Sequence, residues 1–274
     1  MQSTSSDGSA ADKGFFGHPR ALGPLFFTEM WERFSFYGIR PMLVLFIAAS
    51  LFDGGLGFDP KTAAAIVGIY GGAIYLAALP GGWLADNWLG QRRAVWYGSI
   101  LIAFGHLSIA LSALLGAVAF FVGLIFIVLG TGLFKTCISV MVGSLYDESD
   151  VRRDGGFAIF YMGINIGSLF APLFTGLLMD SLGWHWGFAM GGLGMLIALL
   201  LFRLWAVPAM QRADAERGRA STWDAPAQRR RHVGPVVSLC LALIAALVAL
   251  VATGVVTIDA RAVAEAMTSV LIVA

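Results

Sequence analysis

Long apolar segments alternate with short polar segments along most of the chain. Six of the apolar segments are long enough to cross a bilayer, which requires about 20 mostly apolar residues per helix. These segments cover roughly residues 23–51, 62–85, 94–115, 117–141, 157–179 and 184–206. The pattern therefore predicts an all-α membrane protein whose main unit is a six-helix bundle at residues 23–206.

The segments on either side of this bundle differ in character. Residues 1–22 are small and polar and lack the apolar core of a signal peptide, so we expect a disordered cytoplasmic tail. Residues 207–233 are polar and end in a basic cluster, which predicts a cytoplasmic linker. Residues 234–274 are apolar again. They contain one full span and a second that begins near Arg261. Only about 14 residues follow that start, which is too few to span, so we expect a helix cut short within a longer protein.

Composition and charge support the membrane assignment. Hydrophobic residues make up 58% of the chain and charged residues 13%, against about a quarter charged in soluble domains. The net charge of +1 provides no field to attract a polyanion, which argues against nucleic-acid binding. Lysine and arginine gather in the tail and the even-numbered loops, so the positive-inside rule predicts a cytoplasmic N-terminus.

The first span carries four charged residues, although each charge near the bilayer centre costs about 2.5–3.5 kcal/mol. At about 100° per residue, these charges and two aromatic residues fall on one face of a helix. The charged stripe consists of Glu29, Glu32, Arg33, Phe36, Tyr37 and Arg40. Neutralisation of Glu29 by Arg33, four residues on, would leave Arg40 unexplained. We therefore expect the stripe to face a water-filled cavity or a partner helix.

Lys135 is a second charge within an apolar span. It requires a carboxylate or an anionic ligand, unless its long side chain snorkels to the cytoplasmic interface. A buried lysine also changes its protonation readily, which suits proton-linked work. Lys135 is therefore a candidate for binding an anionic group.

Several uncharged polar residues also lie within the spans. Tyr161, Asn165 and Ser168 form a polar stripe on the fifth span, and Tyr75 lies on the second. Asn165 and Tyr75 either line a binding site or simply form hydrogen bonds with a neighbouring helix. His106, in the third span, is interpreted as a satisfied polar residue, and the glycines at 163 and 167 indicate close helix packing.

The loop between the second and third spans contains charges of both signs. Asp86 stands at a helix end, and Arg92 and Arg93 follow within seven residues. This arrangement predicts a breakable charge latch between neighbouring helices, and ordinary loop residues are the alternative.

These motifs resemble those of a known family. Residues 82–93 resemble the loop signature of the major facilitator superfamily. Glu29-x-x-Glu32-Arg33 resembles the E-x-x-E-R signature of the proton-coupled oligopeptide transporters, and residues 160–168 resemble the fifth-helix motif of that family. Lys135 stands at the place of the family's helix-4 lysine. The resemblance covers roughly residues 20–206, and the segment from about 234 resembles the extra helices of prokaryotic members.

The resemblance implies symport of di- and tripeptides with protons, by alternating access in a bacterial inner membrane. Protonation of a glutamate, most simply Glu29, would release the pairing of Arg33 with Glu29 and Glu32. Arg40 and Lys135 would bind the peptide carboxylate, and Asp86 with Arg92 and Arg93 would form a gate latch. The resemblance implies a peptide pocket lined by Tyr37, Tyr75, Asn165 and Tyr161. It implies no cofactor besides the coupling proton, and no metal.

The sequence departs from the family pattern at two points. Phe36 stands where many members have a tyrosine, and the second span has no histidine. Coupling would therefore depend on carboxylates. The resemblance also implies a second six-helix half that supplies a glutamate opposite Arg40 and the site for the peptide amine, so we expect no transport by this chain alone.

The sequence is also compatible with two other functions. One is a major facilitator transporter of another cargo, such as nitrate or a drug, because Arg40 and Lys135 would suit a plain anion. The other is a half-transporter fragment that forms a helix bundle without transport. The sequence has no nucleophile–base pair, metal-ligand cluster or phosphate loop, so an enzyme has little support.

Overall fold

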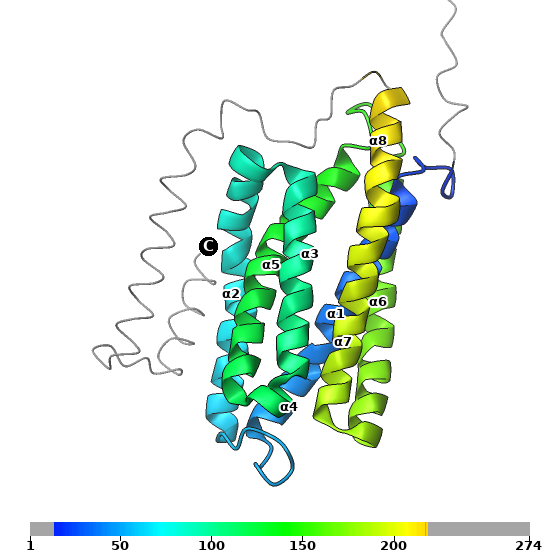
Figure 1. Ribbon diagram of the computed structural model, residues 1–274. Coiled ribbons are helices and arrows are strands. Elements are labelled where there is room, and N and C mark those ends of the chain that lie inside the picture. Colours follow the sequence, from blue (N-terminus) through cyan, green and yellow to red (C-terminus); the bar gives the residue numbers. More distant parts are fainter. Residues whose placement is uncertain (1–13, 217, 219–274) are drawn as a thin grey trace, which may run out of the picture.

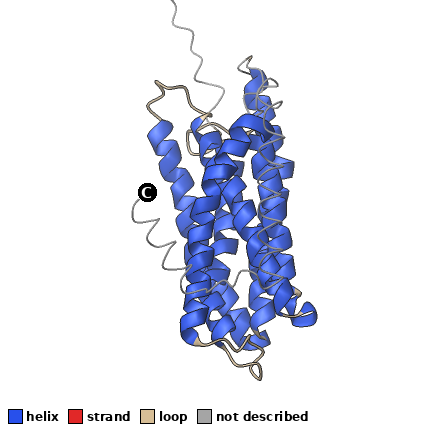
Figure 2. Ribbon diagram, turned by 90° about the vertical axis from the view of Figure 1, so that its left-hand side faces the viewer, coloured by secondary structure: helices blue, strands red, loops and turns tan. Residues whose placement is uncertain are grey.

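The structure, a computed structural model, describes residues 14–216 and 218, and within them the chain is helical (Figure 1). The long helices are α1 (Leu22–Ala48), α2 (Pro60–Leu84), α3 (Gln91–Ala110), α5 (Ala117–Gly143), α6 (Arg153–Leu182) and α7 (Trp184–Leu201). Shorter elements are α4 (Ser112–Leu115), α8 (Val207–Glu216) and the π-helical segments η1 (Ala85–Leu89) and η2 (Phe202–Ala206). The long helices stand side by side as a bundle (Figure 2).

The bundle consists of two packed groups. In one group α5 packs against both α2 and α3, and in the other α1 packs against α6 and α7. The groups meet where α3 contacts α7 and where α1 contacts α2. Figure 1 shows α1 running obliquely behind α7, so that α1 reaches both groups.

Local chemistry explains where the helices begin and turn. Asp59 caps α2, because its Oδ1 accepts hydrogen bonds from the amides of Lys61 and Thr62 at 3.1 Å each, and Pro60 takes the first helical position. Gly90 has a φ of 80°, a conformation that favours glycine. It allows the chain to turn from η1 into α3.

Glycines allow α3 and α5 to approach closely. A Cβ at Gly98 would lie 2.7 Å from the carbonyl oxygen of Gly130, and one at Gly105 would lie 2.7 Å from that of Gly123. The reciprocal contacts are equally tight, at 2.6 Å each. Contacts of this kind replace the hydrophobic driving force that is absent between helices in lipid.

The glycines at 163 and 167 play the same part between α6 and α1. A Cβ at Gly163 would meet the ring of Phe26, and one at Gly167 would meet the backbone carbonyl of Met30. The expectation that this motif serves helix packing is confirmed.

The expected spans match the observed helices with shifts of a few residues. The expected third span, 94–115, consists of α3 and the short α4, and the sixth continues through η2. The first ten residues of the predicted linker at 207–233 are helical, as α8. The predicted apolar spans at 234–274 lie outside the described residues.

The expectation of a disordered tail up to residue 22 is wrong for the residues from 14 onward. Phe15 and His18 form an isolated backbone bridge, and the Leu22 amide donates to the Pro19 carbonyl at 2.9 Å. Ala21 is 1% exposed. The tail is held here because its apolar residues join the core.

Four of the described helices are long and apolar enough to cross a membrane, namely those at 60–89, 117–143, 153–182 and 184–216. Helix α1 is similar in length to these four but carries the charged stripe. Helix α3 has two arginines, Arg92 and Arg93, in its first turn. The chain is therefore a multi-pass membrane protein in which α1, the long helix with the most charged residues, is packed between others.

We predict that Gly167→Ala lowers the melting temperature of the detergent-solubilised protein. The new methyl group would fall on the Met30 carbonyl, and overpacking of this kind costs about 1–3 kcal/mol. Gly176→Ala, on the same helix, is the matched control, because a Cβ there meets nothing within 4 Å. Alanine favours helix over glycine by roughly 0.5–1 kcal/mol, so the control should be neutral or stabilising. Equal shifts in both variants would contradict the packing role of Gly167.

Candidate functional site

Three charged side chains of the stripe form a buried ion cluster on α1. The Nε of Arg33 lies 2.7 Å from Oε1 of Glu29 and 2.9 Å from Oε2 of Glu32. The exposed fractions are 2% for Glu29, 1% for Glu32 and 4% for Arg33. The helix places Glu29 and Arg33 one turn apart, so the expected i,i+4 pair is formed.

The cluster is only partly satisfied. Glu29 accepts a directed hydrogen bond from Arg33, whereas Glu32 lies at ion-pair distance without hydrogen-bond alignment. Oε2 of both glutamates and Nη2 of Arg33 are buried without a hydrogen-bond partner in the described part of the chain. Two carboxylates share one guanidinium, so the fully ionised cluster carries one net negative charge. Such a cluster is costly in a low-dielectric site and can be relieved by a proton or a further cation.

Lys135 supplies a cation close to this cluster. Its Nζ lies 4.5 Å from the centre of the Tyr75 ring, so the side chain reaches from α5 to α2 rather than only to the interface. Lys135 also interacts electrostatically with Glu32. The structure therefore brings the second intramembrane charge to the same region as the first.

Arg40 lies at the far end of the stripe and is exposed. The guanidinium carbons of Arg33 and Arg40 lie 5.7 Å and 5.8 Å from the centre of the Phe36 ring. Phe36 thus stands between a buried arginine and an exposed one, and Tyr37 packs edge-to-face against it at 5.1 Å. An exposed guanidinium beside an aromatic ring is a suitable site for a carboxylate.

Sequence reasoning missed Tyr70 of α2. This side chain is 5% exposed, and its hydroxyl has no hydrogen-bond partner among the described residues. It interacts electrostatically with Glu32 and Arg40. Tyr70 lies in an apolar span, five residues before Tyr75 and on a different face of the helix, so the sequence gave no pattern that pointed to the charges of α1.

The polar residues of α6 are placed differently. The Asn165 amide donates to the carbonyl of Tyr161 at 3.0 Å, within its own helix, and Ser168 donates to the carbonyl of Asn165. Tyr161 is 54% exposed. These side chains lie on an exposed face of α6, and their hydrogen bonds within the described part of the chain stay inside α6 and do not join them to the ion cluster.

His106 on α3 is satisfied at one ring nitrogen only. Its Nε2 shares a hydrogen bond of 2.6 Å with the Ser35 hydroxyl of α1, and its Nδ1 is buried without a partner in the described region. The bond joins the two packed groups on the side of α1 opposite the stripe.

The predicted latch residues lie at the other end of α2. Asp86, in η1, accepts a hydrogen bond of 2.5 Å from Nε2 of Gln91. Arg92 and Arg93, in the first turn of α3, line a polar pocket that also includes Arg203. A pairing of Asp86 with either arginine stays a prediction.

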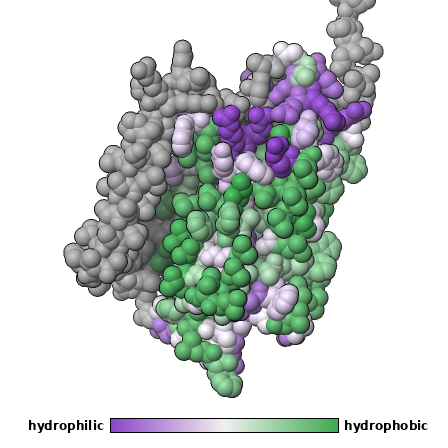
Figure 3. Space-filling model, viewed as in Figure 1, coloured by the Kyte–Doolittle hydropathy of each residue, from purple (hydrophilic) through white to green (hydrophobic). Residues whose placement is uncertain are grey.

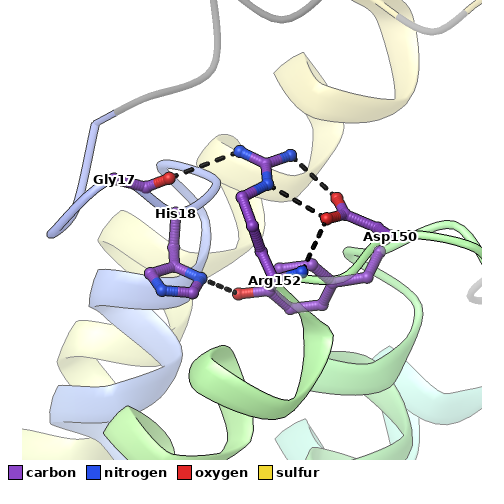
Figure 4. A network of polar contacts seen from close by, with 5 residues as sticks. Gly17, His18, Asp150 and Arg152 are labelled. Carbon is purple, nitrogen blue, oxygen red and sulfur yellow. Dashed lines mark hydrogen bonds and ion pairs between the residues drawn. The ribbon is translucent and has the colours of Figure 1, made fainter.

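A separate clasp fixes residues 17 and 18 to the loop before α6, and sequence reasoning missed it (Figure 4). Arg152 forms an ion pair with Asp150 at 2.8 Å and donates to the carbonyl of Gly17 at 3.3 Å. His18 Nδ1 lies 3.0 Å from the Tyr146 hydroxyl. The hydrogen bonds from Arg152 hold the pKa of Asp150 at about 2, below its ordinary 3.8.

The bundle and its intramembrane charges define the class of protein: a polytopic helical membrane protein built like one half of a major facilitator transporter. Residues 92–206 match the model of the POT family. A peptide transporter of Yersinia enterocolitica is 60% identical over 97% of this chain and 52% of its own length. A di-/tripeptide transporter of Lactococcus lactis is 44% identical over 85% of this chain and 46% of its own.

A crystal structure of a POT peptide transporter in complex with sulfate superposes with a TM-score of 0.80 at 39% identity, over 92% of this chain and 50% of that one. The chain belongs to the POT family, as its motifs indicated. It spans about half the length of the relatives it matches.

We predict that Asp150→Asn releases residues 14–22 from the bundle. At pH 7 the Asp150 carboxylate holds Arg152 against Gly17, and its loss should increase hydrogen exchange at the His18 and Leu22 amides. The pair is partly exposed, so we expect an effect of at most about 1 kcal/mol. Glu148→Gln, an exposed carboxylate in the same loop, is the control.

The pH dependence of this clasp has a definite sign. The folded pKa of Asp150 is depressed, so its contribution is present above the ordinary value of 3.8 and is lost as the pH falls toward about 2. The difference between wild type and Asp150→Asn should shrink across that interval. A difference that persists unchanged at pH 2 would contradict the role of the carboxylate.

Proposed function

We propose that this chain forms the N-terminal half of a proton-coupled symporter of di- and tripeptides. The observation that carries the proposal is the buried ion cluster of α1, with Arg40 further along the same stripe and Lys135 on α5. Membership of the POT family and the identity with named peptide transporters support the same cargo. Transport by alternating access requires a second six-helix half, with the site at the junction of the two.

We assign the proton to the ion cluster, where two carboxylates share Arg33. Protonation of one glutamate neutralises the net charge of the cluster and weakens the attraction that fixes Arg33. Glu29 is the proposed carrier, because it forms the directed hydrogen bond that a proton would disturb. A proton can drive a conformational change only if its affinity differs between the two states, and a partner that moves provides that difference.

We assign the peptide carboxylate to Arg40 and Lys135. Arg40 is exposed, and Lys135 is half-buried beside Tyr75. Tyr37, Tyr75, Tyr161 and Asn165 are proposed to line the remainder of the pocket, and Tyr70 is added to them because it interacts electrostatically with both Glu32 and Arg40. Binding of the carboxylate near the cluster couples the two ligands through charge.

We place the protein in the bacterial inner membrane with a cytoplasmic N-terminus, as the distribution of lysine and arginine favours. Asp86, Arg92 and Arg93 then lie on the cytoplasmic side, where they are proposed to latch the gate. The proton is the coupling ion, and no other cofactor is proposed.

We predict that Lys135→Ala, in the complete protein that contains this chain, abolishes accumulation of a labelled dipeptide driven by an inward proton gradient. In the proposed site Lys135 binds the peptide carboxylate, and a hydrogen bond to a charged group contributes about 1.5–3 kcal/mol, so the loss of accumulation should exceed about tenfold. Uptake into proteoliposomes is the measurement, and Lys61→Ala, an exposed lysine at the start of α2, is the matched control. Wild-type accumulation in Lys135→Ala would contradict the assignment. Uptake of nitrate but not of dipeptide by the wild-type protein would show that the cargo is different.

We predict that Glu29→Gln separates transport from the proton gradient. The amide cannot take up the proton, so gradient-driven accumulation should be lost. Exchange of labelled for unlabelled peptide, which needs no net proton movement, should continue in part. Equal loss of both activities would argue that Glu29 is needed for folding or for peptide binding, not for coupling.

A further inference from the structure

A polar pocket lies between the cytoplasmic ends of α3 and α7. It has a volume of about 320 Å³ and is lined by Arg92 and Arg93 of α3 and by Arg203 of η2. No carboxylate is among the residues that line it in the described part of the chain. An arginine has five N–H donors, so each can engage a phosphate while keeping other bonds. Three arginines from α3 and η2 thus line one small space.

Trp96 joins this pocket to a second one. Its ring lies 6.0 Å from the guanidinium carbon of Arg203, and the same side chain begins an apolar groove between α3 and α7. The groove has a volume of about 670 Å³. A tryptophan that is polar on one side and apolar on the other is typical of the boundary between lipid head groups and acyl chains.

The groove faces outward from the bundle. Large apolar side chains form its walls, and Phe104, Leu107, Leu193 and Leu196 are each about half exposed, between 46% and 58%. Figure 3 shows hydrophilic surface over the upper ends of these helices and hydrophobic surface below it. From Trp96 to Ala110 the groove follows α3 for about 21 Å at 1.5 Å per residue. One leaflet of the hydrocarbon core is about 15 Å thick, so the groove is deep enough for an acyl chain.

We propose that this combined site binds one anionic phospholipid of the leaflet that surrounds these helix ends. The phosphate group contacts Arg92, Arg93 and Arg203, the glycerol lies against Trp96, and one acyl chain fills the groove along α3 and α7. A soluble anion would use only the basic pocket, and a neutral lipid would use only the groove. The continuity of the two through Trp96 selects a ligand that has both parts.

The test measures lipid binding to the complete protein in detergent by native mass spectrometry. Dioleoyl phosphatidylglycerol, which is anionic, is the main probe. Dioleoyl phosphatidylcholine has the same chains without the net negative charge. Glycerol 3-phosphate has the anionic phosphate without acyl chains. We expect phosphatidylglycerol to bind more tightly than phosphatidylcholine and not to be displaced by equimolar glycerol 3-phosphate.

Arg203→Gln is the first variant, because Arg203 lies outside the proposed gate latch. A basic residue near an anionic surface contributes about 1 kcal/mol, so we expect affinity for phosphatidylglycerol to fall about fivefold, with phosphatidylcholine unaffected. Arg212→Gln is the matched control. It removes the same charge nine residues further on, where Arg212 lines a different pocket.

Ala189→Phe is the second variant. Ala189 lines the groove, and the larger phenylalanine side chain should fill it and exclude the acyl chain. We expect weaker binding of dioleoyl phosphatidylglycerol and unchanged binding of its dihexanoyl form. Ala103→Phe makes the same test from the α3 wall if the first variant does not fold.

Three results would overturn the proposal. Equal affinities for phosphatidylglycerol and phosphatidylcholine would show that the arginines do not bind the phosphate group. Full displacement by glycerol 3-phosphate would indicate an anion site alone. Unchanged binding of the long-chain lipid in both groove variants would show that the groove is filled by something else, such as another part of this chain.

Discussion

The bundle is organised around the need to bury Arg33 together with Glu29 and Glu32 inside a membrane. An isolated charge in hydrocarbon is too costly to keep, so these three must remain in contact and on one side of α1. Close contacts with α6 and α7 fix the position of α1. Gly163 and Gly167 of α6 meet Phe26 and the Met30 backbone, and Gly194 of α7 meets Phe34. The packing of α6 and α7 against α1 thus fixes the orientation of the stripe, which points toward α2 and α5.

Phe36 lies between Arg33 and Arg40, the two arginines of the stripe, which have different surroundings. Arg33 is buried with its carboxylates, while Arg40 is exposed, and the ring of Phe36 lies between 5 and 6 Å from both guanidiniums. The ring keeps the guanidiniums apart while stabilising each. In the proposed site, a ligand carboxylate would therefore reach Arg40 without competing directly with Glu29 for Arg33. A tyrosine at this position would add a hydroxyl that could bridge the two.

The sequence was informative where a single helix carries the pattern. The stripe of α1 and the Glu29–Arg33 pair follow from helical periodicity, and the charge of Lys135 stands out because everything near it is apolar. Contacts between residues far apart in the chain could not be predicted from the sequence. Tyr70 and the bond between Ser35 and His106 each depend on how two helices pack.

The tail was misjudged for a related reason. The residues that precede position 14 are mostly small and polar, a composition that predicts disorder, and, in spite of Phe15 and Phe16, this expectation extends through residues 14–21. Their order depends on Tyr146, Asp150 and Arg152, more than 120 residues later, and on the burial of Ala21. Neither could be read from the tail itself.

The groove between α3 and α7 follows from the position of the small residues on α3. Gly98 and Gly105, seven residues apart, lie on one face and draw α5 into backbone contact. The face toward α7 carries Trp96, Phe104 and Leu107 instead, whose bulk lines an open space. Helix α3 thus packs closely against α5 on one side and leaves a groove against α7 on the other. A groove at the lipid-facing surface costs little in a membrane, because acyl chains can fill it and restore the missing contacts.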